Sequence, residues 1–158
     1  TASDAVGAAR NFLAFCLEPL EALRMKQYTV GSSLGATAIA RLSALAANAF
    51  SLVRDARSAA AFQLAAWEIA TETRGKLALD KGDFKVVDAL LPTRDLAQGW
   101  LDLISSGAWG SNRDAVILKA GGTQDLVTDI APVPVPAAGL LLIGGLGGLA
   151  ALRRRKTA

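Results

Sequence analysis

The chain has 158 residues, about the length of one ordinary domain, and its composition excludes several kinds of chemistry. It has no histidine, which excludes His-based catalysis and imidazole metal ligands, and its single cysteine, Cys16, excludes an internal disulfide and a cysteine-cluster metal site. The net charge is +3, but residues 153–156 carry four positive charges, so residues 1–152 have a net charge of −1. We therefore expect no metal, no cofactor and no nucleic-acid partner.

Two short strands are predicted near the start of the chain. Residues 11–17 form an apolar run that Glu18 and Pro19 end, which is typical of a strand. Residues 28–30 are a second candidate strand, and the Gly- and Ser-rich residues 31–35 predict a turn after it.

Two helices are predicted next. Residues 36–53 are rich in alanine and place apolar side chains at helical spacing. The side chains expected to face inward are Ile39, Leu42, Leu45, Ala46, Ala49 and Val53. Residues 58–73 form the second helix, with Ser58 as its N-terminal cap and Gly75 as its terminator.

A hairpin and a third helix follow. Residues 76–79 and 84–87 flank a polar turn at 80–83 and are predicted to pair as strands. Pro92 or Thr93 opens the third helix, which ends before Gly107. Its inward side chains are expected to be Leu96, Trp100, Leu103 and Ile104.

Two late strands complete the body. Residues 115–119 and 126–130 are β-prone and lie on either side of the glycine pair at 121–122. We therefore predict an α+β fold of small mixed strands with about three helices, plus a C-terminal transmembrane helix. The expected domains are residues 1–131 and a tail at 132–158, joined by a proline-rich linker.

The tail has three parts. It begins with an alternating motif: Val133, Pro134, Val135, Pro136 and Ala137. The apolar run 137–152 would be about 24 Å long as a helix, close to the roughly 30 Å of a hydrocarbon core. The tail then has four cations that would stop transfer and stay cytoplasmic: Arg153, Arg154, Arg155 and Lys156. We predict a membrane span, with a buried core helix or loop as the alternative.

This tail resembles the C-terminal sorting signals of the VPLPA type, a sister of the PEP-CTERM signal of Gram-negative bacteria that make exopolysaccharide. Val135 stands where that family usually has Leu. The resemblance implies an exported protein, transiently anchored in the inner membrane, whose tail an exosortase-type protease-transpeptidase recognises before release or re-anchoring at the cell surface. Residues 1–4 show no basic or apolar leader, so we expect a processed form or a fragment.

Two segments of the body carry candidate chemistry, Phe15-Cys16-Leu17-Glu18-Pro19 and Phe62-Gln63-Leu64-Ala65-Ala66-Trp67-Glu68-Ile69. Taken singly, a cysteine in an apolar strand is usually a small buried hydrophobe, and a glutamine on a helix is usually solvated. Together the segments resemble the thioester domains of bacterial surface proteins, in which a TQxA-type motif supplies the glutamine and the cysteine lies well upstream. Phe62 stands where that motif usually has Thr, and Ala66 where Ile or Val is common. Residues 118–125 also resemble the closing strand region of related sorted proteins.

The resemblance implies an internal thioester with Cys16 as the thiol and Gln63 as the acyl donor. It would react once with an amine or hydroxyl group on a polysaccharide or protein surface, so we expect covalent attachment and no enzymatic turnover. The expected shell is Phe15, Phe62, Trp67 and Glu68, with ordinary packing, or solvation for Glu68, as the alternative. Since no histidine can act as a base, a helix N-terminus near the sulfur could lower the thiol pKa.

Other functions stay open. One is a non-covalent structural or interaction module of the extracellular matrix, in which Cys16 and Gln63 only pack. Another is a cysteine hydrolase, disfavoured because no motif supplies a base. A calcium site could be sought among Asp80, Asp83, Asp125 and Asp129, but their spacing fits no calcium motif and solvated turn acids are the better interpretation.

Overall fold

The structure is a computed structural model, and it describes residues 2–3, 9–10, 12–72, 75–86 and 91–128 of the chain. The chain divides into two units, Asn11–Ala131 and a second that joins Thr1–Arg10 with Pro132–Ala158. In the second unit the described elements are β1 (Ala2–Ser3) and β2 (Ala9–Arg10), which pair antiparallel.

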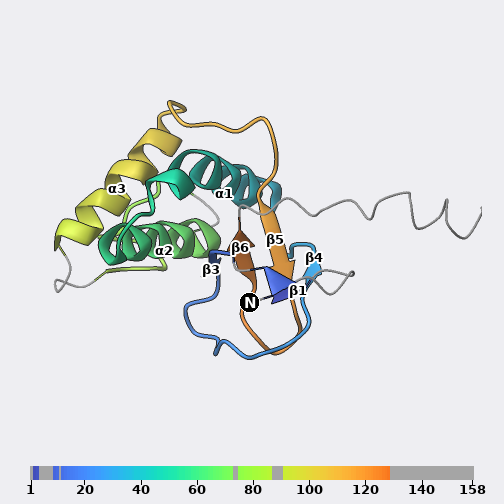
Figure 1. The fold of residues 1–158 in the computed structure, drawn as a ribbon. Coiled ribbons are helices and arrows are strands. Elements are labelled where there is room, and N and C mark those ends of the chain that lie inside the picture. Colours follow the sequence, from blue (N-terminus) through green and yellow to red (C-terminus); the bar gives the residue numbers. More distant parts are fainter. Residues whose placement is uncertain (1, 4–8, 11, 73–74, 87–90, 129–158) are drawn as a thin grey trace, which may run out of the picture. The chain divides into compact units, whose positions relative to one another are not determined.

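The larger unit contains a four-stranded antiparallel sheet. Its strands are β3 (Ala14–Cys16), β4 (Thr29–Val30), β5 (Val116–Lys119) and β6 (Leu126–Thr128). They lie in the order β3-β6-β5-β4, so the two late strands are central and the two early strands are the edges (Figure 1). Each of the four lies within a range that the sequence predicts, although each is shorter.

The three helices are α1 (Ala36–Ala49), α2 (Ala56–Thr71) and α3 (Leu91–Ser105), with a 3-10 turn, η1 (Phe50–Leu52), after α1. The helices α1 and α2 contact the sheet, and α3 packs against these two helices. The predicted α+β class with three helices is confirmed. The predicted cap of α2 is wrong: the cap is Asp55, whose carboxylate accepts the main-chain N–H of Ser58 at 2.7 Å. Ser58 is instead the third residue of the helix, and its hydroxyl oxygen accepts the main-chain N–H of Asp55 at 3.1 Å, which closes a capping box.

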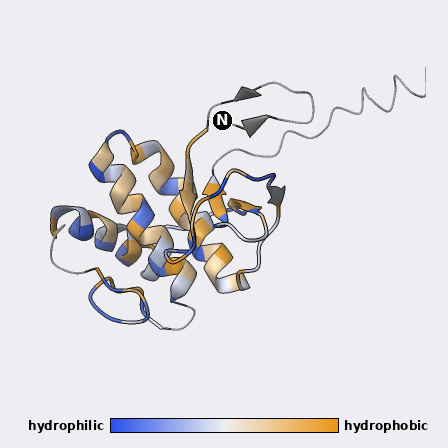
Figure 2. Ribbon diagram, turned by 90° about the horizontal axis from the view of Figure 1, so that it is seen from below, coloured by the Kyte–Doolittle hydropathy of each residue, from blue (hydrophilic) through white to orange (hydrophobic). Residues whose placement is uncertain are grey.

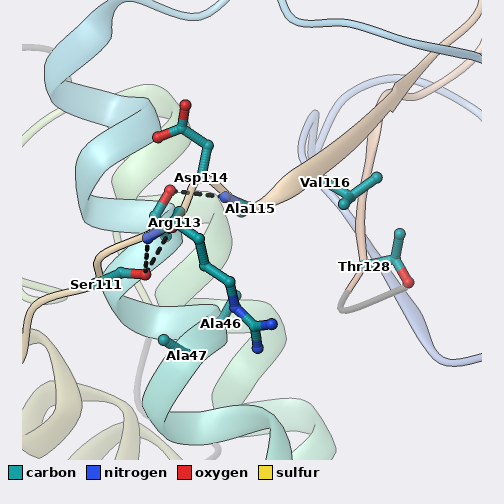
Figure 3. A pocket seen from close by; sticks show the side chains of 9 residues that line it. Ala46, Ala47, Ser111, Arg113, Asp114, Ala115, Val116 and Thr128 are labelled. Carbon is teal, nitrogen blue, oxygen red and sulfur yellow. Dashed lines mark hydrogen bonds between the residues drawn. The ribbon is translucent and has the colours of Figure 1, made fainter. Parts of the chain in front are cut away.

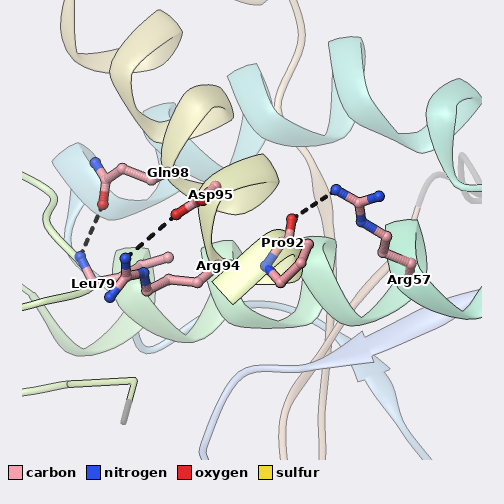
Figure 4. A network of polar contacts seen from close by, with 6 residues as sticks. All are labelled: Arg57, Leu79, Pro92, Arg94, Asp95 and Gln98. Atoms are coloured by element: carbon pink, nitrogen blue, oxygen red, sulfur yellow. Dashed lines mark hydrogen bonds and ion pairs between the residues drawn. The ribbon is translucent and has the colours of Figure 1, made fainter. Parts of the chain in front are cut away.

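The predicted hairpin at 76–87 is also wrong in its strands, and its hydrogen-bonded turn closes at residues 78–81, two residues before the predicted 80–83. In residues 76–86 no strand is present; Lys81 N–H bonds to the Ala78 carbonyl and Val86 N–H to the Leu79 carbonyl. The carboxamide of Gln98 on α3 bonds to two of the remaining main-chain groups. It accepts the Leu79 N–H at 3.0 Å (Figure 4), and it donates to the Leu77 carbonyl at 3.2 Å. Residues 77 and 79 thus form hydrogen bonds with the side chain of Gln98 and not with a neighbouring strand. Residue 87 lies outside the described part.

The core lies between the helices and the sheet. Its sheet side consists of Phe15, Leu17, Ile117 and Val127. Its helix side includes Leu42, Leu45, Ala49, Phe62, Ile69 and Leu101, all fully buried. The helices are banded with hydrophilic and hydrophobic residues, as expected of helices that bury one side (Figure 2).

The inward face of α3 differs from the prediction at one leucine. Trp100 is buried as expected and packs near Trp109, with ring centroids 6.4 Å apart. Leu103, however, is 38% exposed, and the buried leucine is Leu101. The two leucines are two positions apart and therefore point about 200° apart around the helix axis. Leu101 lies one turn after the buried Ala97, on the side that faces the core, and Leu103 does not.

None of the helices in the described part of the chain has the length and hydropathy that a bilayer crossing needs. The predicted span at 137–152, the Val-Pro motif and the cationic cluster lie outside the described residues.

The two leucines of α3 provide a matched test of this packing. We expect Leu101→Ala to lower the free energy of unfolding by about 2–5 kcal/mol, because it opens a cavity at a fully buried site. Leu103→Ala removes the same atoms from a partly exposed site and should cost less than about 1 kcal/mol. Urea denaturation of both variants measures the difference; equal losses would contradict the orientation of α3.

Candidate functional site

The structure brings Cys16 and Gln63 together, although 47 residues separate them in sequence. The side-chain oxygen Oε1 of Gln63 accepts the main-chain N–H of Cys16 at 3.0 Å, and its Nε2 donates to the main-chain carbonyl of Cys16 at 2.6 Å. Both polar atoms of the carboxamide are therefore engaged by one residue of β3.

The register of the sheet explains this pairing. Leu17 donates its N–H to the Asp125 carbonyl, so the main-chain groups of Leu17 face the neighbouring strand. Cys16, opposite Leu126, then directs its own N–H and carbonyl away from β6 toward the open edge of the sheet. The Gln63 carboxamide occupies that edge as the main chain of another strand would, which satisfies two groups that are costly to leave unpaired.

An aromatic cluster lies on the core side of β3. Phe15 and Phe62, the neighbours of the paired residues, are both buried with ring centroids 4.3 Å apart. Phe50, to which no sequence motif points, also joins the cluster, with its ring centroid 4.6 Å from that of Phe62 and 5.8 Å from that of Phe15. Since side chains alternate along a strand, Cys16 points to the opposite face from Phe15 and is only half-buried. The rings thus keep water from the core side, while the thiol side is accessible.

Trp67 and Glu68 lie further along α2. Trp67 is one turn after Gln63 on the same side of the helix, and its ring meets Phe84 edge-on at 5.9 Å. Its indole Nε1 is buried and has no hydrogen-bond partner in the described part of the chain.

Glu68 is fully buried, so the solvated alternative for this residue is wrong. Its Oε1 accepts the main-chain N–H of Ala78 at 2.7 Å, which ties the 77–79 segment to α2. Burial raises the pKa of Glu68, and the nearby acids Glu72 and Asp80 act in the same direction, while the Ala78 N–H and Arg41 oppose them.

The electrostatics at Cys16 do not activate the thiol in advance. Burial raises the pKa of the Cys16 thiol above its usual value, so the group is protonated at neutral pH. The expected helix N-terminus is not at the site, because α2 begins at Ala56 and Gln63 lies two turns into it. The macrodipole acts mainly within the first turn. What the site polarises is instead the Gln63 carboxamide, through the main-chain N–H and carbonyl of Cys16.

Other candidate sites are weaker. Asp80 and Asp83 are exposed, whereas Asp125 is buried and is not a solvated turn acid; Asp129 lies outside the described residues. The part of the chain that the structure describes has no group of acids, cysteines or histidines that could hold a metal ion. A small hollow between α1 and β5 is lined by Arg113, Asp114 and two serines (Figure 3).

The two serines of this hollow serve the fold. Ser43 accepts the Ala115 N–H at 2.8 Å and donates to the Ile39 carbonyl, and Ser111 bonds to Arg113. Their hydroxyl groups are therefore already engaged within the chain.

Comparison of the chain with protein-family models, with curated proteins and with solved structures gives no significant match. The case for a function therefore depends on the motifs and on the geometry of Cys16 and Gln63.

The buried acid makes a testable difference to stability. The folded-state pKa of Glu68 is raised above the unfolded value of about 4.3, so the folded protein holds the proton more tightly. The stability that protonated Glu68 contributes is fully present below the unfolded-state pKa of this residue, and it is lost as pH rises through its folded-state pKa. Glu68→Gln keeps an oxygen for the Ala78 N–H but cannot ionise, so it should abolish that loss.

Urea denaturation between about pH 4 and pH 8 measures the effect. Asp95→Asn is the control, because it makes the same change from a carboxyl group to an amide at a side chain that is 68% exposed. Parallel profiles for the wild type and Glu68→Gln would contradict the assignment.

Proposed function

We propose that this protein is an exported, single-use covalent attachment domain whose reactive group is an internal thioester between Cys16 and Gln63. The observation that carries the proposal is the double hydrogen bond between the Gln63 carboxamide and the main chain of Cys16. It supports the proposal because it holds the acyl carbon of Gln63 beside the residue that bears the chain's only thiol.

The formation step balances without a cofactor. The Cys16 sulfur attacks the side-chain carbonyl carbon of Gln63, the C–N bond breaks, and the thiol proton leaves with ammonia. Charge develops on Oε1, to which the Cys16 N–H already donates at 3.0 Å, so this donor is placed as an oxyanion stabiliser. The departing nitrogen is held by the Cys16 carbonyl at 2.6 Å. The raised thiol pKa makes deprotonation the difficult part of this step.

In the attachment step, a partner amine or hydroxyl group attacks the same carbon. The C–S bond breaks, the Cys16 thiol is freed, and an amide or ester joins the partner to Gln63. Because the thioester is consumed, the protein acts once and is not an enzyme. Until then the bond would join β3 to α2 across 47 residues, an effect of about 3–4 kcal/mol if it restrains the unfolded chain as a disulfide does.

The alternative is a non-covalent interaction module in which Gln63 only pins α2 to the sheet. A specific observation favours it: Gln98 uses its carboxamide in the same way, bonding to the main chain of Leu79 and Leu77 with no thiol involved. A bidentate glutamine is therefore also a structural device in this chain. Reactivity toward a small amine separates the two functions.

Intact mass spectrometry of the full chain, with and without methylamine, is the test. The thioester predicts a mass that is lower than that of the sequence by one ammonia. Treatment with methylamine should then increase the mass of this species by one methylamine. Both effects should vanish in Cys16→Ala and in Gln63→Ala, since each removes one partner of the bond.

Gln98→Ala is the matched control, because it deletes the other pinned glutamine and should keep the ammonia deficit. An unmodified wild-type mass with a freely alkylated Cys16 would sink the thioester and leave the non-covalent module.

For the tail we propose a transmembrane helix at residues 137–152 and processing by an exosortase-type enzyme of the inner membrane. The support is the order of the Val-Pro motif, the apolar run and the cationic cluster in the sequence. The extracellular partner would be a polysaccharide or protein surface that presents amine or hydroxyl groups.

Replacing Pro134 and Pro136 by alanine should block processing, because it removes the two proline rings that define the motif the enzyme would recognise. We expect the variant to keep a C-terminal epitope and to accumulate in the inner-membrane fraction, while the wild type loses the epitope. Epitope loss from both proteins in a host with an exosortase system would contradict recognition through the motif.

A further inference from the structure

An unusually apolar loop follows the Cys16 strand. The loop, residues 18–28, joins β3 to β4 and displays Leu20 at 99%, Leu23 at 61% and Met25 at 96% exposure. Single exposed leucines are ordinary on a protein surface, but three large apolar side chains within six residues form an apolar cluster, which is typical of an interaction site. Their exposure therefore calls for a partner.

The exposure is not the result of a loose loop. The Thr123 hydroxyl accepts the Arg24 N–H at 2.8 Å and lies 3.3 Å from the Ala22 carbonyl. The Gln124 amide donates to the Glu21 carbonyl, and Glu18 accepts the Asp125 N–H at 2.9 Å. Figure 1 shows this loop beside residues 120–125 at the end of the sheet that lies away from the helices.

These contacts fix the main chain of the loop and leave its apolar side chains in solvent. A surface that is already ordered loses little conformational entropy when it binds, which favours an interaction role.

The charges of the loop indicate the kind of partner. Two exposed cations, Arg24 and Lys26, alternate with Leu23 and Met25, against one exposed acid, Glu21. Apolar tips with cations beside them fit a bilayer interface, where the apolar groups enter the acyl boundary and the cations meet anionic headgroups. In a two-fold dimer the same loop would face itself and bring like cations together, which disfavours a second copy.

We propose that residues 18–28 dock the protein onto an anionic lipid surface through Leu20, Leu23 and Met25, with Arg24 and Lys26 in contact with the headgroups. This role is separate from the thioester, because it requires neither the Cys16 thiol nor the Gln63 carboxamide. Its failure would leave the proposed attachment chemistry unaffected.

The test places an environment-sensitive dye on the loop of the full chain. In a Cys16→Ser background, Met25→Cys carries the dye, and a second protein carries it at Asp83→Cys in the exposed 80–83 turn. With phosphatidylglycerol vesicles, the position-25 dye should show a blue shift and higher emission, while the position-83 dye should not. This comparison excludes binding through the C-terminal apolar run, which is present in both proteins.

The position-25 dye also measures the affinity, because vesicle co-sedimentation would register insertion of the C-terminal apolar run as well. Replacing Leu20 and Leu23 by serine in this dye-labelled protein should weaken the vesicle dependence of its emission at least about tenfold. The control, Leu52→Ser with Leu91→Ser, removes two other exposed leucines and should bind as the wild type does. Arg24→Gln with Lys26→Gln should lessen the preference for phosphatidylglycerol over phosphatidylcholine.

Three results would overturn the proposal. One is that vesicles leave the emission of the dye at position 25 unchanged, and another is that they change the emission equally at positions 25 and 83. The third is a concentration-dependent dimer in sedimentation that replacement of Leu20, Leu23 and Met25 by serine abolishes, since this would assign the loop to a second copy of the chain.

Discussion

The open edge of β3 is the constraint on which the site depends. At Cys16 the main-chain N–H and carbonyl face away from β6, and a side chain of α2 must supply what a fifth strand would otherwise provide. This requires α2 to lie close to the sheet. The helix buries Ala61, Ala65 and Ala66 completely, and such small side chains let it approach its neighbours. The Asp55 capping box fixes where the helix starts, and with it the position of Gln63.

The contacts between Cys16 and Gln63 prepare the Gln63 carboxamide for attack, but they do not activate the Cys16 thiol as a nucleophile. A chain without histidine has no imidazole to accept the thiol proton, and burial at Cys16 favours the protonated thiol. What the site does hold in advance is the amide, through a donor on its oxygen and an acceptor at its nitrogen. Gln98 shares this bonding, so the hydrogen bonds alone do not distinguish a reactive glutamine from a structural one. The thiol makes the difference, which is why the proposal is tested through reactivity.

The sequence predicted those features that local chemistry determines. Four strands lie within predicted ranges, and the three helices follow from apolar spacing and alanine content. The pairing of Cys16 with Gln63 came from a motif resemblance, because no local signal joins residues 47 positions apart. Phe50 was missed for the same reason, since it meets Phe62 only after α1 and α2 pack.

The errors have physical causes as well. Asp55 and Ser58 are both good caps and take reciprocal roles, so residue type alone could not assign them. Residues 76–86 have strand-like composition, but their main-chain groups bond to Glu68 and Gln98, whose positions depend on tertiary packing. Burial of Glu68 and Asp125 was likewise invisible to a pattern that treats acids as solvated.

The site and the apolar loop share one short piece of chain. Leu17 and Glu18 follow Cys16 directly, and both bond to Asp125, the first through its main chain and the second through its carboxylate. The turn between β5 and β6 therefore holds the end of the Cys16 strand and the beginning of the loop with the same residue. Because Thr123 and Gln124 bond to the next part of the loop, a displacement of this turn would move both features together. A small four-stranded sheet can in this way hold an exposed loop and a half-buried thiol in fixed positions, although both lie beside its outermost strand.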